Sequence, residues 1–275
     1  MTIAVAIKTG AAVVFAADSK VTIAGRVGFR EDGEPNWVSQ TYDNSYKLAY
    51  DRERRVMAMV AGHPNIGAIP VADFISAWNS PAANSAEQLE SNLDDLLARM
   101  ESESRAVWSK TKIEESKWPG PSIIFASALP GGRQARVWHA TVQGGTFSKE
   151  EILLQPGIYL EGSYAEVFTL LYGIDFRKGP DIAASLGVDH DKFIQAWRQS
   201  KTLSAIDKIK LAAMPAQDAM ELAAFLANLQ VQMDRFLPGE PASGGPIDLM
   251  VLQLFPQPTI VEFPGKTLHH PGQPT

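Results

Sequence analysis

The feature that most constrains the fold is a pair of apolar runs joined by a tight turn at the start of the chain. Residues 2–8 and 11–17 are nearly continuous hydrophobic segments, and Thr9-Gly10 between them is a candidate two-residue turn. Such runs are typical of strands that are buried on both faces of a sheet. We therefore expect a hairpin inside a layered structure, with Asp18 at its far end.

A threonine directly follows the initiator methionine. If Met1 is removed, Thr2 carries a hydroxyl and a free α-amine on one residue. An N-terminal threonine whose own amine acts as the general base is a known way to activate an alcohol nucleophile. Threonine is also common after methionine, so Thr2 by itself is weak evidence of catalysis, and its meaning depends on the residues that accompany it.

The charge and the cysteine content exclude several classes of function. The formal net charge is -6 and no Lys/Arg run is interleaved with aromatic residues, so we expect no nucleic-acid partner. The chain has no cysteine, which excludes disulfides, thiolate nucleophiles and cysteine-based metal sites. Its five histidines show no helical metal-binding spacing, so we expect neither a metal nor a cofactor. A cytoplasmic location is the default expectation.

Nothing in the sequence predicts a membrane segment. The apolar N-terminus lacks the basic start of a signal peptide, and Lys8 interrupts it. No other run is long and uncharged enough to span a bilayer. We therefore expect no membrane partner.

Hydrophobic periodicity predicts the order of the remaining elements. Strands are expected over 46–50, 56–61, 122–128, 135–142 and 152–160, with an irregular exposed hairpin or loop over 21–40. The last two strands, over 247–255 and 259–263, are expected to form a closing hairpin. Helices are expected over 66–78, 85–100 with a weaker continuation to 117, 162–174 and 216–236. One or two further helices are expected over 182–210, with Asp189 or Asp191 as the candidate cap before Phe193. Ser85 and Gln88 resemble a capping box at the start of the second helix.

The order of strands, two helices, strands, helices and strands is not the alternation of a doubly wound sheet. It favours an α+β fold in which two sheets pack face to face between outer helix layers, a four-layer αββα sandwich. No interior linker divides the chain, so we expect one domain over 1–263. Residues 264–275 form a Pro/Gly/His tail without periodicity, which we expect to be flexible.

The hairpin, Asp18, Lys47 in YKL, Gly62 in VAGH and the late segment SGGPIDLMVL at 243–252 together resemble the β-type subunits of the proteasome. The resemblance is greatest to bacterial proteasome-like members that begin at Met-Thr without a long propeptide. It implies the N-terminal-nucleophile hydrolase type of αββα sandwich and a threonine endopeptidase acting on peptides or unfolded proteins. It also implies self-association into a ring-like homo-oligomer, with an ATP-dependent unfoldase as a candidate partner.

By this resemblance Thr2 is the nucleophile, Lys47 the catalytic lysine and Asp18 the acid beside it. Gly62 would offer its backbone N–H to the oxyanion. The chemistry is reasonable, because a buried ammonium penalises a second positive charge nearby and so favours a neutral α-amine on Thr2. A carboxylate at Asp18 would keep the lysine charged and oriented.

The sequence departs from the family pattern in several places. The Gly-Ser-Gly-Ser segment is here Gly162 to Ala165, so Ser163 is present but the second serine is not. The late aspartate is replaced by Glu240, which is expected to hydrogen-bond near Thr2 together with Ser243. Residues 23–42 form an insertion, and 176–210 have no clear counterpart.

The resemblance also defines the residues around the side chain on the acyl side of the cleaved bond, the P1 residue. They are uncharged: Val21, Ser45, Ala49, Val60, Pro64 and Ala68. An uncharged pocket offers no ion-pair partner to Arg, Lys, Asp or Glu, so we expect apolar P1 residues to be preferred.

Two alternatives remain. One is an N-terminal-nucleophile amidohydrolase that acts on a small-molecule amide. The other is a catalytically silent structural subunit, which the departures at Tyr164, Ala165 and Glu240 suggest.

Overall fold

The computed structural model of the 275-residue chain describes residues 2–29, 35–43, 45–67, 69–110, 120–129, 131–132, 134–143, 145–199 and 205–263. The strands are β1 Ile3–Lys8, β2 Ala12–Asp18, β3 Val21–Phe29, β4 Pro35–Tyr42, β5 Leu48–Asp51, β6 Val56–Gly62, β7 Asn65–Ile66, β8 Ile69–Pro70, β9 Pro121–Ala128, β10 Ala135–Gln143, β11 Thr146–Ile152, β12 Gly157–Gly162, β13 Ile247–Gln253 and β14 Thr259–Phe263. The helices are α1 Val71–Ser76, α2 Ala86–Trp108, α3 Ala165–Tyr172, α4 Gly179–Ser185, α5 His190–Gln199 and α6 Ala216–Asp234, with short 3-10 turns at Phe176–Lys178, Ile206–Lys208 and Leu211–Ala213.

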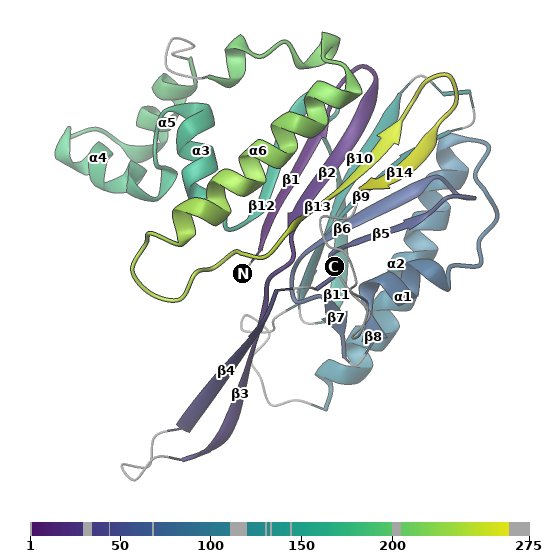
Figure 1. The fold of residues 1–275 in the computed structure, drawn as a ribbon, viewed down its shortest axis with the longest axis horizontal. Helices are drawn as coiled ribbons and strands as arrows, with labels where there is room; N and C mark the ends of the chain where they lie inside the picture. Colours follow the sequence, from purple (N-terminus) through teal and green to yellow (C-terminus); the bar gives the residue numbers. More distant parts are fainter. Residues whose placement is uncertain are drawn as a thin grey trace, which may run out of the picture.

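Ten of these strands form two antiparallel sheets (Figure 1). The first sheet has the order β12-β1-β2-β13-β14, and the second has the order β11-β10-β9-β6-β5. The expected N-terminal hairpin is confirmed: β1 and β2 pair antiparallel, flanked by β12 and β13, and both are buried along their whole length. The closing hairpin of β13 and β14 is confirmed as well.

The two sheets pack against each other through their inner faces. Alternate residues of β1 and β2 meet alternate residues of β6, β9 and β10 in one buried cluster, which includes Ala4, Ala6, Phe15, Met57, Met59, Ile124, Ala126 and Val137. Because side chains alternate between the two faces of a strand, the remaining residues of the same strands point outward. Both faces of each sheet are therefore buried, as the continuous apolar runs predict.

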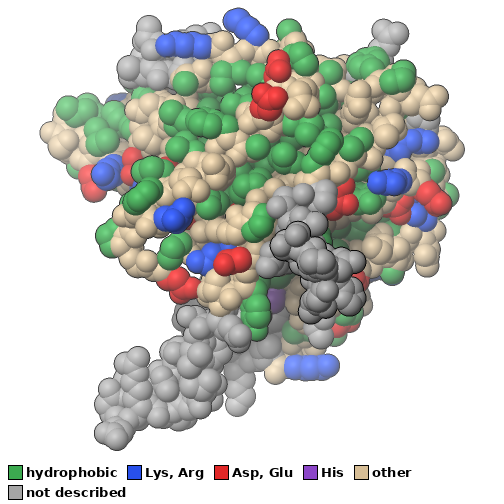
Figure 2. All heavy atoms as spheres, viewed as in Figure 1, with side chains coloured by type: hydrophobic (Ala, Val, Ile, Leu, Met, Phe, Trp, Pro, Cys, Tyr) green, Lys and Arg blue, Asp and Glu red, His purple; other side chains and the backbone are tan. Residues whose placement is uncertain are grey.

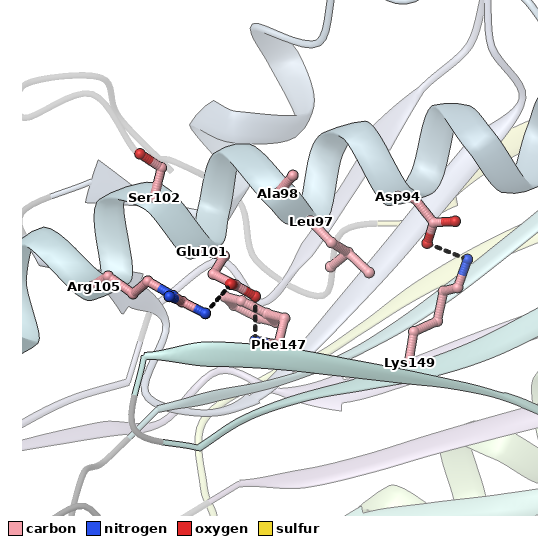
Figure 3. A pocket seen from close by; sticks show the side chains of 8 residues that line it. All are labelled: Asp94, Leu97, Ala98, Glu101, Ser102, Arg105, Phe147 and Lys149. Carbon is pink, nitrogen blue, oxygen red and sulfur yellow. Dashed lines mark hydrogen bonds and ion pairs between the residues drawn. The ribbon is translucent and has the colours of Figure 1, made fainter.

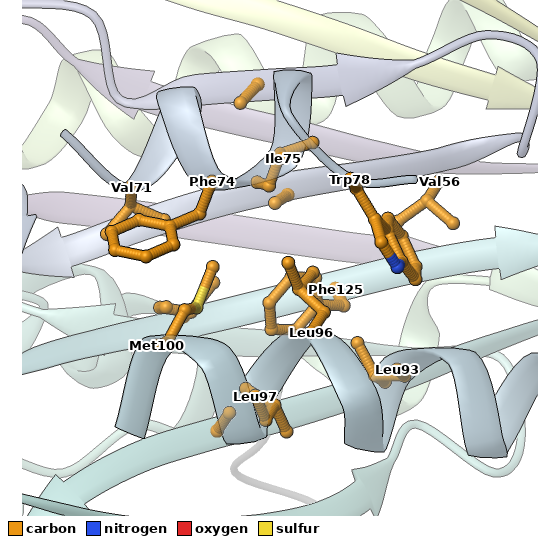
Figure 4. Packing of buried hydrophobic residues seen from close by; sticks show 14 of the residues in the cluster. Val56, Val71, Phe74, Ile75, Trp78, Leu93, Leu96, Leu97, Met100 and Phe125 are labelled. Carbon is orange, nitrogen blue, oxygen red and sulfur yellow. The ribbon is translucent and has the colours of Figure 1, made fainter. Parts of the chain in front are cut away.

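Helices cover the outward faces. α3 and α6 pack on the first sheet through Val167, Leu171, Ala223, Leu226 and Ala227. α1 and α2 pack on the second sheet, where Phe125 of β9 lies among Val71, Phe74, Leu93, Leu96 and Met100 (Figure 4). The expected α+β class is thus confirmed, and the structure shows that both large sheets are antiparallel.

α2 begins where its capping residues predict. The side-chain oxygen of Ser85 accepts a hydrogen bond of 3.2 Å from the backbone N–H of Gln88. The side-chain oxygen of Gln88 accepts one of 2.9 Å from the N–H of Asn84, one residue before the cap. Two N–H groups without helical partners are satisfied in this way. The helix reaches Trp108, and residues 111–117 of its expected continuation lie outside the described residues.

Two expected elements differ from the structure. The helix predicted over 66–78 begins only at Val71, because Gly67 has φ +62° and Pro70 has the extended ψ of 142°, and the short strands β7 and β8 occupy these positions. The strand predicted over 152–160 is two strands, β11 and β12, which belong to different sheets. Apolar residues on both sides of Pro156 concealed this crossing.

The segment predicted as an irregular hairpin or loop over 21–40 is a two-stranded ribbon. β3 and β4 pair antiparallel with a register shift between Arg26 and Gly28, and the ribbon extends away from both sheets (Figure 1). β3 begins three residues after Asp18, and β4 ends five residues before Lys47. The ribbon therefore connects the two segments that carry these residues.

The segment over 176–210 adds α4 and α5 beside α3 (Figure 1). The side chain of Asp189 accepts hydrogen bonds of 3.1 Å from the N–H groups of Asp191 and Lys192, which confirms the expected cap. Tyr172 lies against Trp197 with their ring centroids 6.1 Å apart. This aromatic contact attaches α5 to α3.

Candidate active site

The candidate site is organised around the carboxylate of Asp18 at the end of β2. Asp18 is fully buried, and its Oδ1 accepts hydrogen bonds from Lys47 Nζ at 2.7 Å and from the N–H of Ile3 at 3.2 Å. Its Oδ2 accepts one of 2.8 Å from the N–H of Gly244. A buried carboxylate with an ion-pair partner and two backbone donors has its hydrogen-bonding capacity largely satisfied.

The insertion does not separate Asp18 from Lys47. The chain leaves β2, runs through the β3–β4 ribbon and returns beside its starting point, where the N–H of Ser45 donates to the carbonyl of Ser19 at 2.8 Å. Lys47 then lies directly before β5, with its backbone carbonyl accepting from the N–H of Val60 at 2.8 Å. These contacts hold the lysine stem, and its side chain is only 3% exposed.

Burial and pairing act in opposite directions on Asp18. Burial raises the pKa of the Asp18 carboxyl above its ordinary value, whereas the Lys47 ammonium and the N–H groups of Gly244 and Ile3 oppose that rise. Each partner needs the other, because an unpaired charge in this place would be costly. The pair is therefore a fixed charge arrangement next to the start of β1.

Thr2 is held at the start of β1 by its backbone. It is 2% exposed, and its carbonyl accepts a hydrogen bond of 2.6 Å from the N–H of Ser163. Gly162 makes this approach possible: it has φ +82°, and a Cβ there would lie 1.9 Å from the carbonyl oxygen of Thr2. Since Ile3, the next residue, donates to Asp18, the structure brings Thr2, Asp18, Lys47 and Ser163 together.

Ser243 has a partner that the sequence analysis did not identify. Its N–H and its hydroxyl both donate to Oδ2 of Asp234, at 2.9 and 2.6 Å. Glu240, expected in this place, is exposed and accepts a hydrogen bond of 2.8 Å from the hydroxyl of Thr41. Asp234 is the last residue of α6, nine positions before Ser243, and the only hint in the sequence was its place at the end of the most strongly periodic helix.

Gly62 ends β6, opposite Pro121 of β9. It has φ +75° and is exposed, so its backbone N–H lies at a sheet end that a ligand can approach. The strand arrangement places this end of β6 beside β5, to which Lys47 leads.

A pocket of about 230 Å³ lies next to Lys47. Four of the six expected P1 residues line it, namely Ser45, Ala49, Val60 and Pro64, together with Tyr46, Lys47, Leu48, Asn65, Pro70 and Ala72. Val21 is half-buried at the base of the ribbon and does not line it, and Ala68 lies outside the described residues. Apart from Lys47, the lining is uncharged.

A larger pocket of about 630 Å³ lies elsewhere, between α2 and β11 (Figure 3). Its charged side chains are paired with each other: Arg105 with Glu101 at 2.6 Å, and Lys149 with Asp94 at 2.5 Å. Figure 3 shows Leu97 between these two pairs. None of the candidate catalytic residues lines this pocket, so we do not place the reactive chemistry there.

Within the described ranges, no three His, Asp or Glu side chains gather as a metal site would require. No helix in the described part of the chain has the length and apolar character needed to cross a bilayer.

The fold defines a mixed α/β protein with antiparallel sheets, and comparisons with known proteins add little to that class. No family model matches the chain, and no curated protein matches it. Solved structures similar to it include a Gly-1 mutant of Anbu from Hyphomicrobium sp. strain MC1, at 15% identity and a TM-score of 0.48, covering 98% of this chain and 89% of that one. They also include Anbu from the same strain, at 14% identity and a TM-score of 0.45, covering 96% and 88%.

These findings correct the family identified from the sequence. The assignment to the β-type subunits of the proteasome is wrong at the level of the family, because the similar solved structures named above are of Anbu, and no family model matches. The features that carried the assignment, a buried hairpin with an aspartate, a lysine and a glycine at fixed points, are too few to identify one family. The likeness is too low to carry an activity over to this chain.

Proposed function

We propose that this chain is a hydrolase of the N-terminal-nucleophile type, a threonine endopeptidase in which Thr2 attacks the substrate after Met1 is removed. The observation that carries the proposal is the buried Asp18–Lys47 pair at 2.7 Å, anchored to the residue next to Thr2. A buried ion pair is expensive and weak evidence of stability, so its place beside a candidate nucleophile favours a chemical role.

The proposed reaction uses one residue as both nucleophile and base. The neutral α-amine of Thr2 takes the proton from Oγ as Oγ attacks the substrate carbonyl, and the fixed charge of Lys47 disfavours protonation of that amine beforehand. The N–H of Gly62 donates to the oxyanion. Collapse breaks the amide bond, the proton passes to the leaving amine, and an acyl ester remains on Thr2. Water then attacks the ester, with the amine again as base, and releases the carboxylic acid.

Thr2→Ala tests this mechanism directly. The substitution removes the hydroxyl and should abolish amide hydrolysis, while the urea midpoint of unfolding stays near that of the wild type. Intact mass of the purified protein must first show that Met1 is absent, since a retained methionine would block the amine. Hydrolysis by Thr2→Ala within a few fold of the wild-type rate would rule out the threonine mechanism.

The small pocket beside Lys47 is the proposed P1 site. Its lining is uncharged apart from Lys47, whose charge is paired with Asp18, so an incoming ionic side chain would lose its hydration without a new partner. Each buried methylene of an apolar side chain gains about 0.8 kcal/mol. Peptides that differ only at P1 should therefore be cleaved with a higher kcat/KM after Leu or Tyr than after Arg or Glu. The reverse order would refute this pocket.

The other candidate functions make different predictions. An amidohydrolase for small molecules would turn over a short amide as a monomer and ignore peptide length. The alternative of a catalytically silent subunit is weakened, because the hydroxyl of Ser243 has a carboxylate partner in Asp234, although Glu240 does not fill that place.

We also propose that the chain self-associates. Apolar side chains gather on the outer face of α6 and just beyond it, at Phe225, Met233, Phe236 and Leu237, where solvent reaches them (Figure 2). An apolar patch of this kind favours contact with another protein surface. Sedimentation velocity should show a species larger than 29.9 kDa, and Phe236→Ser should weaken it.

A further inference from the structure

We infer that Gln230 is a positioning residue of the proposed threonine hydrolase, because its side-chain amide joins the two backbone segments that flank Thr2. The inference rests on the proposed function, and it adds a residue that neither the sequence pattern nor the Asp18–Lys47 pair identifies. Gln230 lies on α6, is 1% exposed and is one turn away from Asp234.

The oxygen of the Gln230 amide holds the first flanking segment. α3 begins at Ala165 without a side-chain cap of its own, since Tyr164 at the N-cap position makes no capping hydrogen bond. Instead, Gln230 Oε1 accepts from the N–H groups of Glu166 and Val167 at 3.2 and 3.4 Å. An acceptor from a neighbouring helix thus replaces the missing cap. Ser163, whose N–H donates to Thr2, lies two residues before this helix.

The nitrogen of the same amide holds the second segment. Gln230 Nε2 donates to Oδ1 of Asp234 at 2.7 Å, which leaves Oδ2 free to accept from both the N–H and the hydroxyl of Ser243. The next residue, Gly244, donates to Asp18. The segment that touches Asp18 is therefore oriented through Asp234, and Asp234 through Gln230.

Together these bonds form an almost continuous ring around the start of β1. Short stretches of chain complete it. The ring runs from Thr2 to Ser163 and along the first turn of α3 to Gln230. From Gln230 it passes through Asp234 to Ser243. It then continues through Gly244 to Asp18 and Ile3. A buried network in which each donor has its acceptor fixes geometry well, and a mismatch within it is costly. Misplacement of a reacting group by about 1 Å can cost roughly 100-fold in rate.

The donor and acceptor roles of the amide make a polarity swap possible. Gln230→Glu keeps an acceptor for α3 but sets a carboxylate against Asp234. Asp234→Asn keeps an oxygen acceptor for Ser243, but its side-chain NH2 group then faces the NH2 group of Gln230, so that two donors meet without an acceptor. The double variant restores one donor facing one acceptor, with the polarity reversed and the net charge unchanged. Each single variant should lower kcat about tenfold or more with KM within about twofold, and the double variant should recover to within about threefold of the wild type.

The control is a second Gln–acid pair on the same helix. Gln217 Nε2 donates to Glu221 Oε1 at 3.0 Å with the same spacing of four residues, but both side chains are exposed. Gln217→Glu should leave kcat unchanged. Amide hydrogen exchange at Ser163 and Gly244 provides a readout that does not depend on activity. Exchange at both positions should accelerate in the single variants and slow again in the double variant.

Several results would overturn the inference. They are a double variant no better than the worse single one, single variants with wild-type kcat per folded molecule, or unchanged exchange at Ser163 and Gly244. Thr2→Ala is assayed in parallel. If it stays active, the proposed function is lost, and the exchange data alone still decide whether Gln230 positions the segments around Thr2.

Discussion

At the scale of single residues, the site depends on positions where only one residue type fits. Gly162 is the clearest, because its positive φ and its contact with the Thr2 carbonyl are both incompatible with a side chain. Asp18 and Lys47 are similar in their chemistry, since each is buried and paired with the other.

Gly162→Ala should unfold the start of the site. A Cβ at 1.9 Å from the Thr2 oxygen forces the backbone to move, in addition to a cost of about 1–3 kcal/mol for a non-glycine residue with positive φ. Gly131→Ala is the control, because Gly131 has φ +66° and open space around it, so that only the conformational cost applies. Urea unfolding should show a clearly larger loss for Gly162→Ala. Equal losses would mean that the close approach is unimportant.

Asp18→Asn should destabilise the fold and remove activity together. It leaves the Lys47 ammonium buried without its carboxylate, and breaking a buried pair in this way costs about 3–5 kcal/mol. The double variant Asp18→Asn with Lys47→Met should regain much of that stability, because the buried charge is gone, but it should remain inactive. Urea midpoints and amide hydrolysis separate the two effects. Activity in the double variant would show that the pair has no chemical role.

At the scale of elements, the same residue type contributes differently according to the layer in which it lies. Phe125 of β9 is fully buried under α1 and α2 (Figure 4), whereas Phe225 on the outer face of α6 is 55% exposed. Strands that are covered on both faces carry the core, and helices cover them with one face only.

Phe125→Ala and Phe225→Ala should therefore differ strongly. Removing a buried phenylalanine costs about 3–5 kcal/mol through lost burial and the remaining cavity. Removing a mostly exposed one should change the stability of a monomer by well under 1 kcal/mol. The measurement is urea unfolding of both variants at a protein concentration that suppresses self-association. A large loss for Phe225→Ala under those conditions would indicate contacts that the isolated chain does not make.

At the scale of the whole molecule, the site forms where the ends of several strands meet. Thr2, Asp18 and Gly162 come from three neighbouring strands of the first sheet, and Lys47 leads into the second. The residues between Asp18 and Lys47 form the β3–β4 ribbon, and those between Lys47 and Gly162 include the helices α1 and α2. A site assembled in this way needs both sheets in place, so its activity should be lost as soon as the sheets separate.

The sequence by itself determined the buried N-terminal hairpin, the caps of α2 and α5, the closing hairpin and the α+β class. These depend on local patterns, since runs of apolar residues, capping side chains and turn residues act over a few positions. The sequence also suggested Thr2, Asp18, Lys47 and Ser163, which the structure brings together. Their roles in catalysis remain a prediction.

Only the tertiary structure decided the rest. It divided residues 152–160 between two sheets, it paired Ser243 with Asp234 rather than with Glu240, and it made Gln230 the cap of another helix. Each of these depends on which elements come to lie next to each other. The separation is 64 residues for Gln230 and Glu166, and 159 residues (162 − 3) for Ile3 of β1 and Gly162 of β12. Local sequence patterns contain no record of such contacts, because a glutamine or an aspartate on a helix looks the same whether it faces water or a neighbouring helix end.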